Sequence, residues 1–398
     1  MNRTDDCAQP APRLTWEEDG ATRSARWRSE SGLPPPRRVV VADDRLNADA
    51  AYRLACEGTA MLWRGDYHNA RQLLQAMARR GAHRPRKPGS ADGGVRPPAE
   101  AFHLHRQAQA QRARTLGMLL IPFDADFGIP LRRAPDARAA CAQAWDADGE
   151  PSVASLRELL GLIGASEWHR QGVEVPALGA RIHPCYGVFS PVRGEYVDLV
   201  AAAPLPSQAL AFDIGTGSGV LAAVLAHRGV AHVVATDQDG RALACAADNV
   251  ARLGLAGRVD VVRADLFPDG RAPLVVCNPP WLPARPTSPL EHAVYDPDSR
   301  MLRGFLAGLA AHLAPAGEGW LILSDLAEHL GLRSRGELMD WIAAAGLEVA
   351  GRLDAHPRHP RAGDRSDPLH AARSAEITSL WRLAPTKAPA CRSAAGPA

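Results

Sequence analysis

Between residues 210 and 383, short apolar runs alternate with stretches whose apolar residues recur at helical spacing. This pattern predicts strands that alternate with amphipathic helices. Such alternation is typical of an α/β fold with a mostly parallel sheet and helices on both faces. The last two apolar runs have no helix between them, which predicts an antiparallel pair at one edge. The predicted strands are 210–214, 232–236, 259–263, 274–277, 319–324, 347–353 and 376–383, and the predicted helices are 220–226, 241–253, 298–313 and 335–345.

The N-terminal half has a different pattern. Residues 1–38 are polar and rich in proline, so we expect them to be disordered. Residues 39–175 are predicted to form a mainly helical N-terminal domain with an accessory or substrate-binding role, which begins with a helical hairpin between residues 43 and 82. The proline, glycine and basic residues of 83–100 indicate a linker. Further elements are predicted at 102–115, 136–145 and 152–163, all helical, and at 118–121, a strand.

Two segments border the alternating region. Residues 180–196 combine short strand-like and turn pieces, followed by a predicted helix at 196–203, and such a lead-in often covers a ligand pocket. The tail after Pro385 has no apolar periodicity. We therefore expect a second domain over residues 176–384 and a disordered tail over 385–398.

Composition narrows the class of protein. A chain of 398 residues that is 46% hydrophobic can bury the core of one large or two modest domains. Its formal net charge of +2 gives no general attraction to nucleic acid. The cysteines show no CxxC pair and the histidines no ligand spacing, so we expect neither a disulfide framework nor a metal. No apolar run approaches the roughly 20 residues that span a bilayer, and the start lacks an apolar signal core, so we expect a cytoplasmic protein with no membrane partner.

The stretch 210–219, LAFDIGTGSG, places a glycine-rich turn between a strand and a helix. Gly215, Gly217 and Gly219 carry no Cβ, so a ligand can approach the backbone closely. The helix that follows directs free N–H groups to the same place. The spacing differs from the dinucleotide fingerprint, because Val220 stands where its third glycine is expected. The turn, Thr216 included, therefore favours a nucleotide-type ligand other than a dinucleotide.

Acidic residues end three successive predicted strands, namely Asp213, Asp237 and Asp265. In an open parallel sheet, ligands bind outside the carboxyl ends of the strands. Asp213 suits a cationic group such as an amino acid ammonium, and Asp237 can accept both hydroxyls of a ribose. Asp265, or the backbone beside it at Leu266, can accept a hydrogen bond from an adenine amino group. Together these acids predict the binding site of an adenosine-containing cation.

The sequence Asn278-Pro279-Pro280-Trp281 follows the fourth strand of this region. An amide or exocyclic amino nitrogen is a poor nucleophile because its lone pair is delocalised. If the side-chain oxygen of Asn278 and the carbonyl of Pro279 each accept one N–H, the lone pair of the nitrogen is held in one direction, toward an electrophile. Pro280 biases Pro279 to an extended conformation that presents this carbonyl, and Trp281 can stack on a planar acceptor.

The motifs DIGTGSG, TDQD, ADLF and NPPW, in this order, resemble those of the class I S-adenosylmethionine-dependent methyltransferases of the small-domain group that methylates planar nitrogens. The resemblance implies a Rossmann-like sheet, S-adenosyl-L-methionine as cofactor, and a methyltransferase domain over residues 176–384. The stretch 291–309 is similar to the release-factor glutamine methyltransferases of the HemK/PrmC type. Trp281 departs from that pattern, since those enzymes usually carry tyrosine there, and the N-terminal half does not resemble their helical domain.

Two acceptors fit such a site. One is a glutamine side chain of a protein, with a release factor or a ribosomal protein as the partner, and the stretch after NPPW favours it. The other is an exocyclic amine of an rRNA or DNA base, which would have to leave its base pair to reach the site. The arginine-rich stretch 79–87 and the basic stretch 356–361 favour RNA.

Two other classes of function compete with the transferase. A decayed fold that only binds cofactor or a partner is disfavoured, because the glycines and Asn278 are intact. A nicotinamide dehydrogenase is disfavoured by Val220 and by the lack of a proton-transferring histidine near the turn. The sequence leaves the oligomeric state open.

Overall fold

A computed structural model describes residues 11–82, 97–358 and 364–386. The linker expected at 83–100 falls largely outside these residues, as does most of the tail expected to be disordered. The described chain divides into two compact units. Unit 1 comprises residues up to 96 together with 103–170, and unit 2 comprises 97–102 together with the chain from 171 onward.

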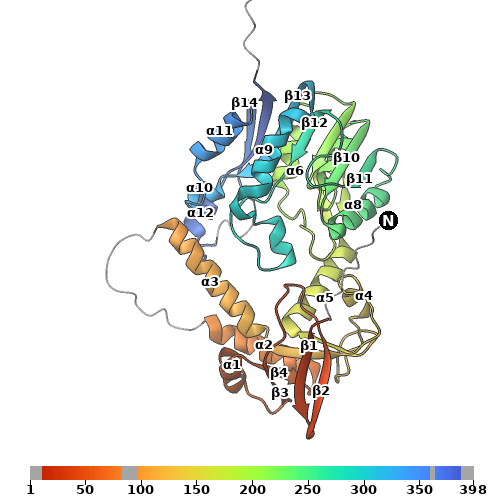
Figure 1. Cartoon of the computed structure of the whole chain (residues 1–398), viewed down its shortest axis with the longest axis vertical. Helices are drawn as coiled ribbons and strands as arrows, with labels where there is room; N and C mark the ends of the chain where they lie inside the picture. The colour runs from red at the N-terminus through yellow and green to blue at the C-terminus, as the bar shows by residue number, and fades with distance from the viewer. Residues whose placement is uncertain (1–10, 83–96, 359–363, 387–398) are drawn as a thin grey trace, which may run out of the picture. The chain divides into compact units, whose positions relative to one another are not determined.

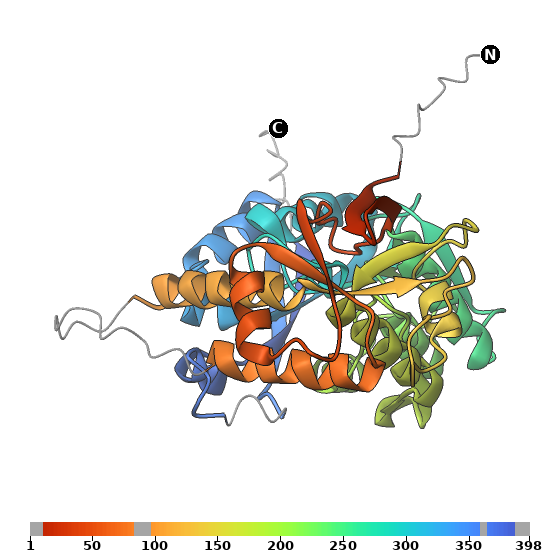
Figure 2. The same ribbon diagram turned by 90° about the horizontal axis from the view of Figure 1, so that it is seen from below.

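Unit 1 is built on a six-stranded mixed sheet in the order β1-β2-β6-β5-β4-β3 (Figure 1). Strand β3 pairs in parallel with β4, whereas β1 and β2 form an antiparallel hairpin. Helices α1 and α2 lie side by side (Figure 2). The strands are β1 Arg13–Glu18, β2 Ala21–Trp27, β3 Arg38–Ala42, β4 Thr59–Trp63, β5 Leu119–Phe123 and β6 Ser152–Ser155. The helices are α1 Ala48–Cys56, α2 Tyr67–Ala82, α3 Pro98–Leu116, α4 Arg138–Ala142 and α5 Leu156–Gln171. The first residues of α3, up to 102, belong to unit 2.

This sheet corrects two expectations. The N-terminal domain contains the expected helices, but they accompany a six-stranded sheet that the pattern did not predict. Disorder over the described part of 1–38 is wrong, because β1 and β2 lie there. The hairpin β1–β2 turns at Asp19-Gly20, two residues with positive φ of 53° and 76°, which is the Asp-Gly turn that joins antiparallel strands. Most side chains of β1 and β2 are exposed, so these strands have too few apolar residues to be predicted from the hydrophobic pattern. Strand β4 was missed because its fully buried run lies between two helices and was included in the predicted hairpin.

Unit 2 contains a seven-stranded sheet in the order β11-β10-β9-β12-β13-β15-β14. Its first five strands run parallel, and β15 pairs antiparallel with both β13 and β14, as the alternation predicted. The strands are β9 Leu210–Ile214, β10 His232–Asp237, β11 Val259–Arg263, β12 Ala272–Cys277, β13 Leu313–Ser324, β14 Leu347–Ala355 and β15 Thr378–Pro385. The helices are α6 Glu195–Ala202, α7 Val220–His227, α8 Gly240–Arg252, α9 Arg300–His312, α10 Leu326–His329, α11 Arg335–Ala344 and α12 His370–Ala375.

The sheet of unit 2 lies between two layers of helices (Figure 1). Side chains of β9 and β12 alternate between the two sides because successive residues of a strand point to opposite faces. Leu274 and Val276 pack with α6 and α7, whereas Val275 and Cys277 pack with α9 and α11. The α/β fold with helices on both faces, predicted from the alternation, is therefore confirmed. Strands β7 Val173–Val175 and β8 Ala180–Ile182 form a separate antiparallel pair before the sheet.

Candidate active site at the carboxyl ends of β9 to β12

The strand order brings the predicted site residues to one edge of the sheet. Strands β11, β10, β9 and β12 are neighbours and parallel, so their carboxyl ends lie at the same edge. Ile214, the last residue of β9, is paired with Cys277, the last residue of β12. Gly215 and Asn278 therefore both leave the sheet at this point.

The three glycines of the turn serve different purposes. All three have positive φ, at 70° for Gly215, 56° for Gly217 and 80° for Gly219. A Cβ on Gly215 would lie 2.4 Å from Cε of Met301, and one on Gly219 would lie 3.2 Å from the Cα of Ala246. A Cβ on Gly217 would meet nothing within 4 Å. Two glycines thus permit internal packing, and only Gly217 leaves open space beside the backbone.

Asp213 lies beneath this turn and holds it in place. Its side chain is buried, and Oδ2 accepts hydrogen bonds from the hydroxyl of Thr216 at 2.6 Å and from the backbone N–H of Ala222 at 3.1 Å. Burial raises the pKa of Asp213 to about 6, although both hydrogen bonds act in the opposite direction. A cation nearby would favour the ionised carboxylate, so Asp213 is poised to respond to a positively charged ligand.

Asp237 ends β10 and contacts the turn from the other side. Its Oδ2 accepts the N–H of Gly217 at 3.1 Å, and its Oδ1 accepts the N–H of Asp239 at 3.0 Å. Partial burial raises the pKa of Asp237. The residue expected to bind a ribose is thus also a structural partner of the glycine turn.

Asp265 and Leu266 follow β11 at the same edge, in different environments. The Asp265 side chain is exposed and lies 3.8 Å from the guanidinium of Arg300. Leu266 adopts a positive φ of 74°, and its carbonyl accepts the hydroxyl of Thr236 at 2.6 Å. A leucine in this conformation is strained, and such strain is often found at ligand sites. The Thr236 bond holds the strained turn against β10.

The loop 278–281 contains a hydrogen bond that the sequence did not predict. The indole Nε1–H of Trp281 donates to Oδ1 of Asn278 at 2.9 Å. This is the oxygen that the sequence assigned to an acceptor N–H. The guanidinium carbon of Arg193 lies 5.0 Å from the centre of the Trp281 ring, a cation–π distance. One face of the ring is therefore covered by the protein.

Arg193 is held by two buried carboxylates. Its Nε lies 2.9 Å from Glu195 and one terminal nitrogen lies 3.0 Å from Oε1 of Glu376. The hydroxyl of Ser324, the last residue of β13, donates to the same oxygen of Glu376 at 2.7 Å. The guanidinium of Arg193 is thus fixed between Glu195 and Glu376.

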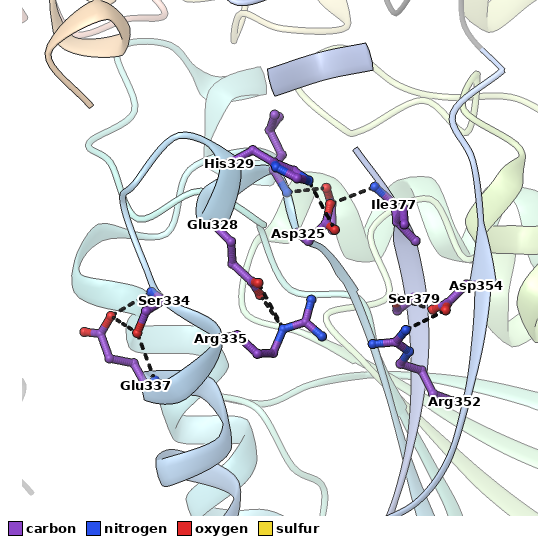
Figure 3. A network of polar contacts seen from close by, with 12 residues as sticks. Asp325, Glu328, His329, Ser334, Arg335, Glu337, Arg352, Asp354, Ile377 and Ser379 are labelled. Carbon is purple, nitrogen blue, oxygen red and sulfur yellow. Dashed lines mark hydrogen bonds and ion pairs between the residues drawn. The ribbon is translucent and has the colours of Figure 1, made fainter. Parts of the chain in front are cut away.

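The neighbouring backbone fixes Glu376 in place. Asp325 accepts the N–H of Ile377 through its side chain at 2.7 Å, and its own N–H donates to the carbonyl of Ile377 at 3.1 Å (Figure 3). His329 lies 3.4 Å from the other carboxylate oxygen of Asp325 (Figure 3). These bonds join the end of β13 to the segment before β15, where Glu376 stands. The carboxylate of Glu376 that binds Arg193 is therefore fixed by the hydrogen bonds between these two segments.

Two further residues organise the site. Asp296 is buried and accepts the N–H groups of Met301 and Leu302, at 3.0 and 3.1 Å, and so caps the start of α9 beside Gly215. Asn249 is buried in α8, where its side chain accepts the N–H of His183 at 2.7 Å and donates to the carbonyl of Ser218 at 3.0 Å. It thus links the lead-in segment to the glycine turn.

Sequence reasoning missed Arg193, Glu195, Glu376 and Asn249 as site residues. Asn249 and Glu376 carried a weak signal, because a polar residue inside an apolar helix face or at the start of an apolar strand needs a partner when buried. Nothing in the sequence marked Arg193 as a site residue, since a lone arginine in a turn is usually solvated. Their importance depends on segments far apart in the chain.

Residues 181–331 match the family model described as methyltransferase small domain. The matched segment is less than half of the chain. It includes the glycine turn, the three strand-end acids and the loop 278–281, whereas unit 1 lies outside it.

Two curated relatives match parts of this chain. The release factor glutamine methyltransferase of Cereibacter sphaeroides is 37% identical over 170 residues, which are 41% of this chain and 57% of the relative. The tRNA1(Val) (adenine(37)-N6)-methyltransferase of Bacteroides fragilis is 38% identical over 96 residues, 23% of this chain and 40% of the relative. The chain thus spans little more than half of the first relative's length, and less of the second.

Among solved structures, the ribosomal protein L11 methylase of Lactobacillus delbrueckii subsp. bulgaricus is similar at 17% identity, with a TM-score of 0.34 over 49% of this chain and 78% of that chain.

Elsewhere in the described residues, a cavity of about 540 Å³ in unit 1 is bordered by β1 and β3 and contains none of the predicted site residues. No helix among these residues is both long and apolar enough to cross a bilayer.

Proposed function

We propose that the protein is an S-adenosylmethionine-dependent N-methyltransferase that acts on a planar amide or amino nitrogen. The observation that carries the proposal is the pairing of Ile214 with Cys277, which sets the glycine turn and Asn278 side by side in a domain of the methyltransferase small domain family. A cofactor cradle and a nitrogen-orienting loop at one strand edge are what methyl transfer to nitrogen requires.

The residues at the strand ends fit the cofactor. Gly217 would allow close approach, since among the three glycines of the turn it is the one whose Cβ position faces open space. The backbone beside Gly215, Thr216 and Gly219 would complete the cradle. Asp237 would bind the ribose, and Asp265 with the backbone of Leu266 the adenine. When bound, S-adenosylmethionine supplies a methyl group on a positively charged sulfur.

The charge of the site supports a cationic ligand. Burial raises the pKa of Asp213, Asp237 and Asp296, which means that each carboxylate lacks full compensation for its charge. A sulfonium and an ammonium group nearby would offset this cost. A dinucleotide, with two anionic phosphates, would increase it. The electrostatics therefore favour S-adenosylmethionine over a nicotinamide cofactor.

The loop 278–281 would orient the acceptor. Oδ1 of Asn278 and the carbonyl of Pro279 would each accept one N–H of an NH2 group, so that the nitrogen lone pair points away from both oxygens. Pro280 would hold the Pro279 carbonyl in place, and the Trp281 ring would stack on the planar group. The nitrogen would lose its extra proton to solvent afterwards, and no covalent enzyme intermediate is needed.

The preferred acceptor is a glutamine side chain of a release factor or a ribosomal protein. The longer of the two similar segments belongs to a release factor glutamine methyltransferase, whose own activity is on glutamine. A nucleobase amine is the alternative, supported by the relative that modifies adenine N6 in tRNA. Both acceptors present an NH2 on a planar carbon, so the loop 278–281 serves either. Unit 1 would bind the macromolecule that carries the acceptor.

Transfer of tritiated methyl groups tests the proposal. Purified release factors, ribosomal proteins and ribosomal RNA are each incubated with the protein and labelled cofactor. We expect label in the protein fraction, lost in Asn278→Ala, whose affinity for S-adenosylhomocysteine by calorimetry stays near that of the wild type. Gln208→Ala, which removes an exposed amide just before the amino end of β9, is the matched control and should keep full transfer.

Each alternative has its own outcome. Label in RNA alone would reassign the acceptor to a nucleobase. Binding of S-adenosylhomocysteine without label in any fraction would favour a protein that only binds the cofactor, and binding of NAD would overturn the cofactor assignment.

A further inference from the structure

The acceptor oxygen of Asn278 is occupied by the protein itself. Trp281 donates its indole N–H to this oxygen at 2.9 Å, within the range of a well-formed hydrogen bond. An amide oxygen has two lone pairs, and the indole N–H occupies one of the two to which an NH2 group could donate if it binds as proposed above. Tyrosine has no ring N–H, so a tyrosine at position 281 could donate only through the hydroxyl at the end of its ring.

Arg193 also restrains the ring of Trp281. Arg193 covers one face of Trp281 at 5.0 Å, and buried Glu195 and Glu376 keep the guanidinium in place. Glu376 is in turn bonded to Ser324 at the end of β13. Arg193 is therefore held over the indole by bonds that do not involve Asn278.

We propose that Trp281 is a latch on the acceptor site: its indole N–H closes Oδ1 of Asn278 in the free protein, and a planar NH2 acceptor opens the site by replacing this hydrogen bond while Arg193 holds the ring. Arg193 is a positioning residue that acts through Trp281. This inference rests on the proposed function, because it assigns the same oxygen to the acceptor.

The latch selects acceptors by their hydrogen bonds. An acceptor with a donor N–H restores the bond that Asn278 loses when the indole moves away. A molecule without such a donor would leave a polar oxygen unpaired and would not open the site. The latch also keeps Asn278 satisfied and in one rotamer while the acceptor is absent.

Trp281→Phe separates the two roles of the ring, since phenylalanine keeps an aromatic face and lacks the N–H. Without the competing bond, the KM for the methyl acceptor should fall by about 2- to 10-fold, the factor that corresponds to one neutral hydrogen bond. Arg193→Lys keeps the charge but loses the planar contact, so the KM should rise. The matched controls are Trp341→Phe and Arg303→Lys. In this second pair of the same unit, the guanidinium carbon of Arg303 lies 5.5 Å from the centre of the Trp341 ring.

A measurement without turnover tests the latch separately. In the nitrogen-15 spectrum of the tryptophan indoles, the signal lost in Trp281→Phe identifies Trp281. That signal should shift in Asn278→Ala, while the signal of Trp341 stays in place. With S-adenosylhomocysteine present, N-acetylglutamine amide or adenine should accelerate solvent exchange of the Trp281 N–H.

The two proposals fail in different ways. If the Trp281 signal is the same in Asn278→Ala, if neither probe changes its exchange, or if Trp281→Phe does not lower the KM, the latch is overturned although methyl transfer stands. If no fraction is methylated, the proposed function fails, and the indole spectra still decide whether Trp281 closes Asn278.

Discussion

Replacement of Asp213 by asparagine should make the stability of unit 2 less sensitive to pH. The carboxylate is 1% exposed and burial raises its pKa from 3.8 to about 6. Between these values the folded protein binds a proton more firmly than the unfolded chain does. The free energy of unfolding therefore falls as the pH rises through this window. Above the folded pKa it is lowered by the full cost of keeping the ionised carboxylate buried.

The size of the effect follows from the shift. A change from 3.8 to about 6 corresponds to about 3 kcal/mol at 1.36 kcal/mol for each pKa unit. The asparagine side chain of the variant would not titrate, and its oxygen could still accept from Thr216 or Ala222. The free energy of unfolding of Asp213→Asn, taken relative to that of the wild type, should therefore increase by up to about 3 kcal/mol between pH 4 and pH 7.

Urea unfolding of both proteins from pH 4 to 7.5, with equal m-values, measures this difference, and other titrating groups cancel in the comparison. A wild-type to variant difference that is flat across the range would refute the reasoning, because it would show that Asp213 is not desolvated. Replacement by alanine would be a poor substitute, since it would also remove the bond to the N–H of Ala222.

Three other predictions concern the same site. The ratio of S-adenosylmethionine to S-adenosylhomocysteine affinity should increase as the pH rises through about 6, because only the first carries a sulfonium that the ionised Asp213 stabilises; a constant ratio in calorimetry would contradict this. Gly217→Ala should weaken S-adenosylhomocysteine binding at least tenfold. Gly217→Ala and Gly219→Ala both place an alanine at positive φ, but Gly219→Ala should lower Tm more, since its Cβ would also press on Ala246; equal Tm losses would argue against the assignment of open space to Gly217. Asn249→Leu should lower the free energy of unfolding by about 3 kcal/mol through the loss of its buried hydrogen bonds, and a loss below about 1 kcal/mol in urea would contradict that role.

The alternating pattern was enough to predict unit 2. Strand and helix periods differ, and a parallel sheet buries its central strands on both faces, so β9 and β12 are visible as apolar runs. The glycine turn and Asn278 were predicted because parallel strands present their carboxyl ends at one edge, a rule that needs only the order of elements. The pattern failed in unit 1, where the β1–β2 hairpin is largely exposed and β4 is a short apolar run between helices.

The sequence by itself determined the α/β class of unit 2, the edge at which its chemistry is assembled, and the residue types available there. Only the tertiary structure decided which glycine faces open space, since Met301 and Ala246 approach the other two from distant helices. It also decided that Trp281 bonds to Asn278 beneath Arg193. The physical reason is that periodicity reports burial and local conformation, whereas the partner of a polar side chain depends on which distant segments the fold brings into contact.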